Sequence, residues 1–284
     1  MIGYLEVLGA VLIWAIFNGV LVKLIKTPGV GVGMWTGIFG IVVFGLMALT
    51  GFNIDTSLSH HQLMALIVLG VSAALNNSFN YTAIKISLPV ALLFHYLAPP
   101  LVVVWYFIFP IEAVSTVSLV ALAIALAGVV YMALPNIKEG SRRVVFLGAA
   151  SAIFYSLEIV LSGYLSNQLN VPAATSSFTK LLFQAMVMPI MGLFVLNESV
   201  KVKQKSDWRL LILGGALLYF SFVLYFLGSA TVGPIQRGVL GYIDRIGAIA
   251  LGAYFFKEER DKITKNIWIG GALVLGAGLI IILH

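Results

Sequence analysis

The chain has 284 residues, of which 61% are hydrophobic and only 10% carry a charge. Soluble proteins average about 45–50% apolar and about 25% charged residues, so a water-soluble fold of this composition would expose large apolar patches and aggregate. The chain contains no cysteine, which excludes disulfides, thiolate metal sites and cysteine nucleophiles. The composition therefore predicts an all-α polytopic membrane protein, whose formal charge of +6 bears on membrane orientation rather than on nucleic acid.

Apolar runs broken by charges or by Pro, Gly and Asn clusters predict ten transmembrane helices. We expect them at residues 4–24, 30–51, 62–84, 88–110, 114–134, 145–166, 172–196, 209–230, 234–256 and 265–284. The first run lacks a basic region before it and a small-residue cleavage site after it, so we interpret it as a span rather than a signal peptide. The short connections leave no room for a separate soluble domain.

The largest break near the middle, residues 135–143, divides the spans into five and five. Tyr96 and the three residues after it in span four correspond to Tyr242 and the three residues after it in span nine. Glu112 corresponds to Glu258 at the same offset of 146 residues. An odd number of spans in each repeat places the second repeat upside down relative to the first. The sequence thus predicts two inverted five-helix repeats. They cover residues 1–137 and 144–284.

These features resemble the EamA-type transporters of the drug/metabolite transporter superfamily along the whole chain. The resemblance is carried by Trp14 and Asn18 in span one, by the run from Ala83-Ile84-Lys85 to Leu93-Phe94-His95-Tyr96-Leu97-Ala98-Pro99, and by Glu112 and Glu258. It implies a ten-helix carrier for small metabolites, often amino acids, that frequently exports them. The sequence departs from the family at Asp244-Arg245, where a Glu-Pro pair is common.

Basic residues are distributed unevenly between the connections. Of 17 Lys and Arg, 14 lie in or beside the connections after odd-numbered spans, and the connections after even-numbered spans hold none. Because cytoplasmic loops carry the excess of Lys and Arg, this predicts cytoplasmic odd connections and both termini outside. The resemblance implies both termini inside, and the sequence leaves these alternatives open.

Five charged residues fall inside the predicted spans, where charges are costly and are retained mostly for function. They are Glu158, Lys180, Arg237, Asp244 and Arg245. Three are cationic and two anionic, which favours a substrate with an anionic group, such as the carboxylate of an amino acid. We expect them to mark the transport path.

In span six, Ser151, Tyr155, Glu158 and Ser162 recur at helical spacing and form one polar stripe, which should face the interior of the bundle. Glu158 could carry a proton or accept a substrate ammonium group; the alternative is a structural ion pair with Lys180 or an arginine. Lys180 could meet a substrate carboxylate or phosphate, or its side chain could extend to the membrane interface.

In span nine, Arg237 and Asp244 lie seven residues apart, with Arg245 beside Asp244. Two guanidinium groups and one carboxylate could hold an anion in bidentate fashion. The alternative is a self-neutralising cluster that locks two helices, as a gate would.

Polar residues in the first half are further candidates. The amides of span three could bind a polar solute or join helices, His95 could contact substrate or a proton, and Trp14 with Asn18 could form an aromatic wall and a polar contact or simply pack. The complete set of predicted binding or translocation residues is Trp14, Asn18, Asn76, Asn77, Asn80, Tyr81, His95, Tyr96, Tyr155, Glu158, Lys180, Gln184, Arg237, Tyr242, Asp244 and Arg245. His60 and His61, adjacent in a predicted connection, do not form a metal site.

Taken together, the sequence predicts a secondary transporter that works by alternating access on small polar metabolites, in the first place amino acids or related compounds. The alternatives are a carrier of organic cations, drugs or sugars, and a non-transporting scaffold or channel. The chain lacks a Walker loop, His-rich metal spacing and a Gly-x-Ser-x-Gly motif, so we expect no enzyme, no metal and no cofactor, with proton coupling through Glu158 or His95 as a hypothesis. The expected partners are a small-molecule substrate and the lipid bilayer of the cell membrane, with the protein acting as a monomer or homodimer.

Overall fold

The computed structural model describes residues 2–50, 54, 57–95, 97–108, 115–139, 142–261 and 265–283. Within these ranges the chain forms helices and short connections and contains no strand. Tyr96 and Glu112, named from the sequence, lie outside the described residues.

The helices of the first half are α1 (Ile2–Ile16), which continues through the π-helical turn η1 (Phe17–Leu21) into α2 (Val22–Leu24), then α3 (Gly29–Ala48), α4 (His60–Ile86), α5 (Leu88–His95), α6 (Ala98–Ile108) and α7 (Thr116–Glu139). Those of the second half are α8 (Arg142–Gly163) with the π-helical turn η2 (Tyr164–Gln168), α9 (Ala173–Met191) with η3 (Gly192–Leu196), α10 (Asp207–Ser229), α11 (Pro234–Phe255), α12 (Lys257–Arg260) and α13 (Lys265–Leu283).

Each predicted span overlaps a helix or a set of consecutive helices, with three differences. Span four is divided into α5 and α6, and Pro99 and Pro100 occupy the first turn of α6, where a missing N–H costs nothing. The predicted break at 135–143 is largely helical, since α7 runs to Glu139 and α8 begins at Arg142. His60 and His61 belong to the first turn of α4, because the Ser59 side chain accepts a hydrogen bond from the Gln62 N–H and caps the helix there.

Seven segments of the described chain are long and apolar enough to cross a membrane. They are Ile2–Leu24, Gly29–Ala48, His60–Ile86, Leu88–Tyr106, Arg142–Gln168, Ala173–Leu196 and Asp207–Ser229. A shorter apolar helix covers Leu119–Met132, and α11 carries three charged residues within its 22. The protein is therefore an integral, multi-pass, helical membrane protein, and the seven segments account for part of the ten predicted spans.

The exterior of the described molecule exposes many large apolar side chains, whereas the five charged residues named from its spans are buried. Large side chains such as Leu46, Phe146 and Phe194 are exposed, whereas Glu158 and Lys180 are buried. A bilayer solvates the apolar exterior, and charges are tolerated at that depth when they face the bundle interior and pair with one another. These charges of the spans therefore lie inside the bundle.

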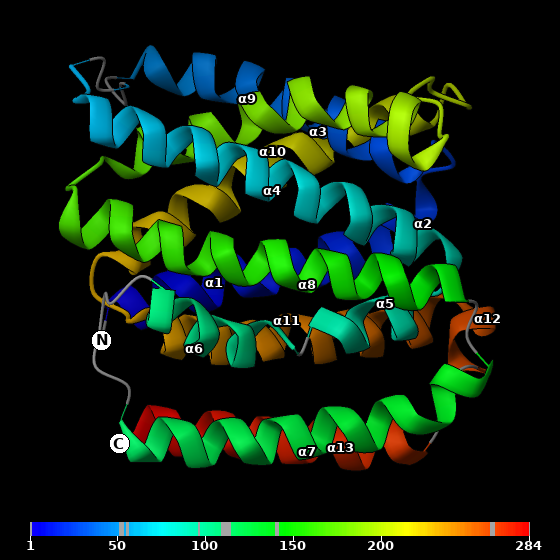
Figure 1. The fold of residues 1–284 in the computed structure, drawn as a ribbon. Helices are drawn as coiled ribbons and strands as arrows, with labels where there is room; N and C mark the ends of the chain where they lie inside the picture. Colours follow the sequence, from blue (N-terminus) through cyan, green and yellow to red (C-terminus); the bar gives the residue numbers. More distant parts are fainter. Residues whose placement is uncertain are drawn as a thin grey trace.

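Seven helices of the described chain pack against one another around the centre of the bundle. Helix α4 packs against α8 and α9, α1 packs against α10 and α11, and α3 packs against α9 and α10. Helices α7 and α13 pair with each other along one edge of the bundle, where α13 also contacts α11 and α7 contacts α5 (Figure 1). The polar residues of α4, α8, α9 and α11 therefore lie on the side of the bundle away from the α7–α13 pair.

Candidate functional site

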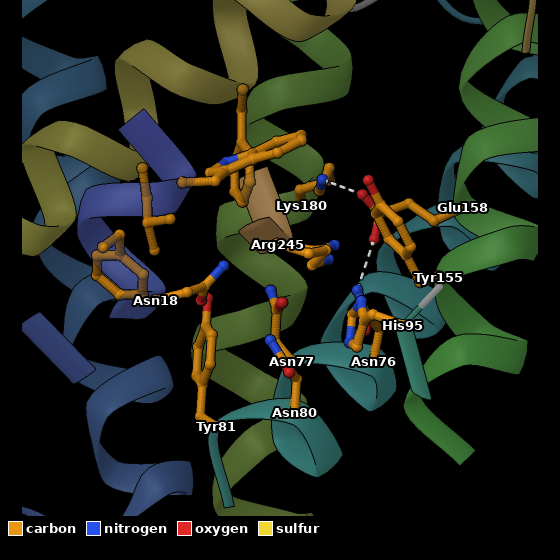
Figure 2. Close-up of a pocket in the computed structure, with 14 residues that line it drawn as sticks. Asn18, Asn76, Asn77, Asn80, Tyr81, His95, Tyr155, Glu158, Lys180 and Arg245 are labelled. Atoms are coloured by element: carbon orange, nitrogen blue, oxygen red, sulfur yellow. Dashed lines mark hydrogen bonds and ion pairs between the residues drawn. The ribbon is translucent and has the colours of Figure 1, made fainter. Parts of the chain in front are cut away.

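A small cavity of about 30 Å³ lies at the centre of the bundle (Figure 2). Its walls come from α1, η1, α4, α5, α8, α9, α10 and α11. The lining residues are Trp14, Phe17, Asn18, Asn76, Asn77, Asn80, Tyr81, His95, Tyr155, Glu158, Lys180, Leu218, Phe222 and Arg245.

The structure thus brings most of the residues named from the sequence into one place. The named residues that lie elsewhere among the described ones are Gln184, Arg237, Tyr242 and Asp244. Sequence reasoning missed Phe17, Leu218 and Phe222, which are ordinary apolar residues in apolar spans. Only the adjacency of Phe17 to Asn18 offered a signal.

Glu158 and Lys180 form an ion pair across the cavity, from α8 to α9. Asn76 Nδ2 donates a second hydrogen bond to Glu158 Oε2 at 3.3 Å (Figure 2). Both charged side chains are buried, so the interfacial location considered for Lys180 is wrong. Glu158 thus forms the ion pair with Lys180 that the sequence offered as one alternative. Both residues of the pair line the cavity.

A hydrogen-bonded chain connects His95 to this pair. Ser151 Oγ donates to Asn76 Oδ1 at 2.7 Å, and His95 Nε2 lies 2.6 Å from Ser151 Oγ. Because the single hydroxyl proton of Ser151 points to Asn76, His95 must donate from Nε2. His95 Nδ1 is then an acceptor, and it has no hydrogen-bond partner among the described residues. Ser151, Tyr155, Glu158 and Ser162 are all buried.

The amides of the site divide into two groups. Asn77 Nδ2 donates to Gln184 Oε1 at 2.7 Å, and Gln184 Nε2 donates to the Gly33 carbonyl oxygen at 2.9 Å, so these two amides join α4, α9 and α3. The side-chain oxygens of Asn18 and Asn80 are buried at the cavity and accept no hydrogen bond within the described part of the chain. Buried acceptors are normally satisfied, so these two oxygens are available to a ligand.

Arg245 supplies the second cation of the cavity. Its guanidinium carbon lies 4.9 Å from the ring centroid of Tyr155, and it forms an ion pair with the adjacent Asp244. Asp244 is itself fully buried and does not line the cavity. The cavity therefore presents one carboxylate and two cations, with the second carboxylate behind Arg245.

Arg237 occupies a separate position, eight residues or about 12 Å of helix before Arg245. Its Nη1 donates to Ser162 Oγ at 2.6 Å and to Ser229 Oγ at 2.5 Å, and its Nη2 donates to the Ile159 carbonyl oxygen at 3.2 Å. Arg237 therefore binds neutral oxygens of α8 and α10 in this structure, and the anion site formed jointly by Arg237, Asp244 and Arg245 stays a prediction.

Tyr242 lies in an apolar cluster with residues of α6, α7 and α13 rather than at the cavity. No group of three or more His, Asp, Glu or Cys side chains that could hold a metal ion occurs in the described ranges. The site is thus a small polar cavity lined by opposite charges inside the helical bundle.

Comparison with known proteins agrees with this description. The EamA-like transporter family matches residues 142–283, half of the chain. An uncharacterized transporter of Helicobacter pylori is 27% identical over 223 residues, which cover 76% of this chain and 72% of that protein. A crystal structure of another protein, 18% identical, superposes with a TM-score of 0.69 over 99% of this chain and 96% of its own, and so has the same fold. This chain belongs to the EamA-like transporter family, within the drug/metabolite transporter superfamily.

Proposed function

We propose that this protein is a secondary carrier of small zwitterionic metabolites, in the first place amino acids. The observation that carries the proposal is the central cavity, where Glu158, Lys180 and Arg245 lie among uncharged hydrogen-bonding groups. A charged group inside a membrane is costly unless function requires it. A cavity with both signs of charge matches a solute that carries both.

Each end of an amino acid has a fitting partner in this cavity. The Arg245 guanidinium, stacked near Tyr155, offers parallel N–H groups to a carboxylate. Glu158 and the oxygens of Asn18 and Asn80 accept hydrogen bonds, as an ammonium group requires. Organic cations would meet two fixed cations here, which favours the zwitterion over them.

We also propose that ten spans form two inverted repeats around the cavity. The packing supports this, because contacts occur in corresponding pairs: α4 with α8 corresponds to α10 with α1, and α4 with α9 corresponds to α10 with α3. The π-helical turns η1 and η2 likewise follow directly on the first long helix of each half, α1 and α8. Rocking of such halves about a central site is a common form of alternating access.

We further propose that the end of the bundle with the basic connections faces the cytoplasm. Outside the spans, the basic residues gather only at the connections after odd-numbered spans, and cytoplasmic loops are the ones that carry such an excess. At that end Lys23 contacts both Lys85 and Glu259. An impermeant thiol reagent that reached a cysteine at this end only from outside the cell would contradict the orientation.

The transport proposal is tested by counterflow in proteoliposomes. Vesicles preloaded with an unlabelled amino acid should accumulate the labelled one transiently and saturably, because a carrier exchanges solutes at one site. Screening the amino acids identifies the substrate. Absence of counterflow for every amino acid, together with counterflow of organic cations or sugars, would overturn the amino-acid assignment; absence for all solutes would favour a scaffold.

Arg245→Gln is the variant that tests the binding mode. Loss of a buried cation that holds a carboxylate costs about 2 kcal/mol or more, so the apparent affinity should fall by about 30-fold or more. Arg209→Gln, at an exposed position at the start of α10, is the matched control and should transport normally. Equal affinities in the two variants would exclude Arg245 as the carboxylate site.

A further inference from the structure

The ammonium group of Lys180 is enclosed by four aromatic rings. Its Nζ lies 3.9 Å from the ring centroid of Phe222, 5.7 Å from that of Phe226, and 5.8 Å from those of Trp14 and Tyr225. Cations are attracted to aromatic faces at these distances, most strongly where water is excluded. We call these four rings the aromatic cage.

The cage walls are held in place without help from Lys180. Trp14 Nε1 donates to Ser221 Oγ at 2.8 Å, and Ser221 Oγ donates to the Leu218 carbonyl oxygen at 2.8 Å, which fixes the indole ring against α10. The Trp14 and Tyr225 rings also contact each other, with centroids 5.1 Å apart. The cage would therefore persist if its cation were removed.

Glu158 completes a site for a primary ammonium group. Within the described residues, Lys180 Nζ donates one hydrogen bond, to Glu158, and the four rings of the aromatic cage lie around it. A carboxylate with aromatic rings around it is the chemistry that proteins use to recognise organic ammonium ions. Here the chain fills such a site with its own side chain.

Two buried hydroxyls lie where the Lys180 ammonium group could move. Ser176 and Ser177 precede Lys180 by four and three residues on α9, on the face toward which a helical side chain leans. Both are fully buried, and neither Oγ has a hydrogen-bond partner within the described ranges. They are acceptors in reach of the flexible lysine stem.

We propose that Glu158 and the aromatic cage form an ammonium subsite, which Lys180 occupies in the empty carrier and which the primary ammonium group of the substrate occupies after binding. This deepens the proposed function, on which it rests. An ionised Glu158 cannot stay buried in the empty carrier without a counter-cation, and Lys180 supplies one. When a zwitterion enters, its ammonium replaces Lys180 at Glu158 and its carboxylate balances the displaced lysine, so the net charge of the cavity is unchanged.

Lys180→Ala makes the subsite accessible to a small probe. The substitution removes Cγ, Cδ, Cε and Nζ, the atoms of n-propylamine, so n-propylammonium chloride is the matched probe and propan-1-ol the neutral control. Ligand binding raises apparent stability. In the purified variant, propylammonium should raise the melting temperature saturably by about 2–4 °C or more. Propanol should not, and neither should propylammonium with the wild-type protein, whose site is filled.

A second substitution distinguishes binding of the ammonium group to Glu158 from simple filling of the space that the lysine side chain leaves. In Glu158→Gln/Lys180→Ala the rise caused by propylammonium should disappear, because the cavity volume is kept and the carboxylate is lost. An equal rise with propanol, no rise in folded Lys180→Ala, or an undiminished rise in the double variant would each overturn the subsite. If Lys180→Ala does not purify as a folded protein, Lys180→Ser, whose hydroxyl can donate to Glu158, is screened in the same way.

The outcome is distinguishable from failure of the transport proposal. If propylammonium stabilises Lys180→Ala but the wild type shows no amino-acid counterflow, the subsite is upheld and the amino-acid carrier is rejected. If the wild type shows amino-acid counterflow but propylammonium does not raise the melting temperature of Lys180→Ala, the carrier is upheld and the exchange of Lys180 for a substrate ammonium group is rejected.

Discussion

At the scale of single residues, Glu158 and Lys180 stabilise the structure only as a pair. Each is almost completely buried, at 2% and 1% exposure. The attraction between buried ions offsets their desolvation roughly, so the pair adds little net stability, whereas one partner left alone is strongly destabilising. The pair is therefore better explained by what it can bind than by what it stabilises.

This dependence predicts opposite effects of single and double substitutions. Glu158→Gln should destabilise the protein by about 3–5 kcal/mol, because it leaves the Lys180 ammonium buried without a counter-charge. Glu158→Gln/Lys180→Met should recover most of that loss, since neither side chain is then charged. Unfolding of the three purified proteins, followed under identical conditions, measures both effects. A double variant no more stable than the single one would show that the pair does more than neutralise itself.

The same variants bear on proton coupling. The amide that Glu158→Gln introduces cannot ionise, so if a proton on Glu158 drives transport, any transport that remains in these variants should no longer depend on pH. An unchanged pH dependence would assign the coupling to another group, with His95 next in the hydrogen-bonded chain.

The residues of the site were predictable in kind rather than in arrangement. Charges and amides inside apolar spans stand out in the sequence, and most of those named line the cavity. Their partners did not stand out, because Lys180 could equally have reached the interface and Arg237 could have joined Asp244. Of the aromatic cage only Trp14 was named from the sequence, because Phe222, Tyr225 and Phe226 lie in an apolar stretch of α10 where aromatic side chains suit lipid and core equally.

At the scale of elements, the π-helical turn η1 positions the polar end of α1 at the cavity. The turn contains Phe17 and Asn18, which both line the cavity, and Gly19, which meets α11. A π-helical turn widens the helix locally and changes which side chains face a neighbour. A Cβ atom on Gly19 would lie 2.6 Å from the carbonyl oxygen of Ala248, so the two backbones are in direct contact there.

Gly19→Ala should therefore separate η1 from α11 and displace Asn18. Because the obstruction is backbone, a rearranged side chain cannot relieve it, and overpacking of this kind costs about 1–3 kcal/mol. Gly45→Ala in α3 is the matched control: no atom lies within 4 Å of its added Cβ, so it should leave stability unchanged or slightly raised. Thermal unfolding and amino-acid affinity of both variants check this. Similar losses in both would refute the backbone contact as the cause.

The elements themselves were largely predictable, because hydropathy reports where a chain can sit in lipid. The ends of the helices were less predictable from the sequence. Helix α7 continues past its apolar run to Glu139, and α4 begins at His60. Helices need apolar residues only within the hydrocarbon layer, and in the aqueous layers the backbone hydrogen bonds and end caps decide where they stop. A search for apolar runs does not detect that part of a helix.

At the scale of the whole molecule, the cavity is covered at both ends by contacts between the halves. At the basic end, Lys23 in α2 and Glu259 in α12 form an ion pair of 2.5 Å. Beside it, Asp207 at the start of α10 accepts hydrogen bonds from the backbone N–H groups of Lys26 and Thr27. At the opposite end, Tyr4 near the start of α1 donates a hydrogen bond to Gln236 Oε1 near the start of α11 at 2.9 Å. Both sets of contacts must alternate between closed and open if the carrier works by alternating access.

The two ends should then respond in opposite ways to substitution. The chain has no cysteine, so Asn80→Cys places a single thiol at the cavity, at a side chain whose oxygen accepts no hydrogen bond among the described residues. In this background, Glu259→Gln weakens closure of the basic end and should raise labelling from the cytoplasmic side. Tyr4→Phe removes the hydrogen bond to Gln236 at the opposite end and should raise labelling from outside. A shift of 1.4 kcal/mol between closed and open states corresponds to about a tenfold change in rate.

Right-side-out and inverted vesicles, treated with an impermeant maleimide, separate the two directions. Alternating access requires that opening one end disfavours opening the other, so each variant should also reduce labelling from its far side. If both variants raised labelling from both sides, the contacts would only hold a scaffold together. If each raised labelling from the side opposite to the one stated, alternating access would stand and the orientation would be reversed. The reciprocity of the response therefore tests the mechanism, and its direction tests the topology.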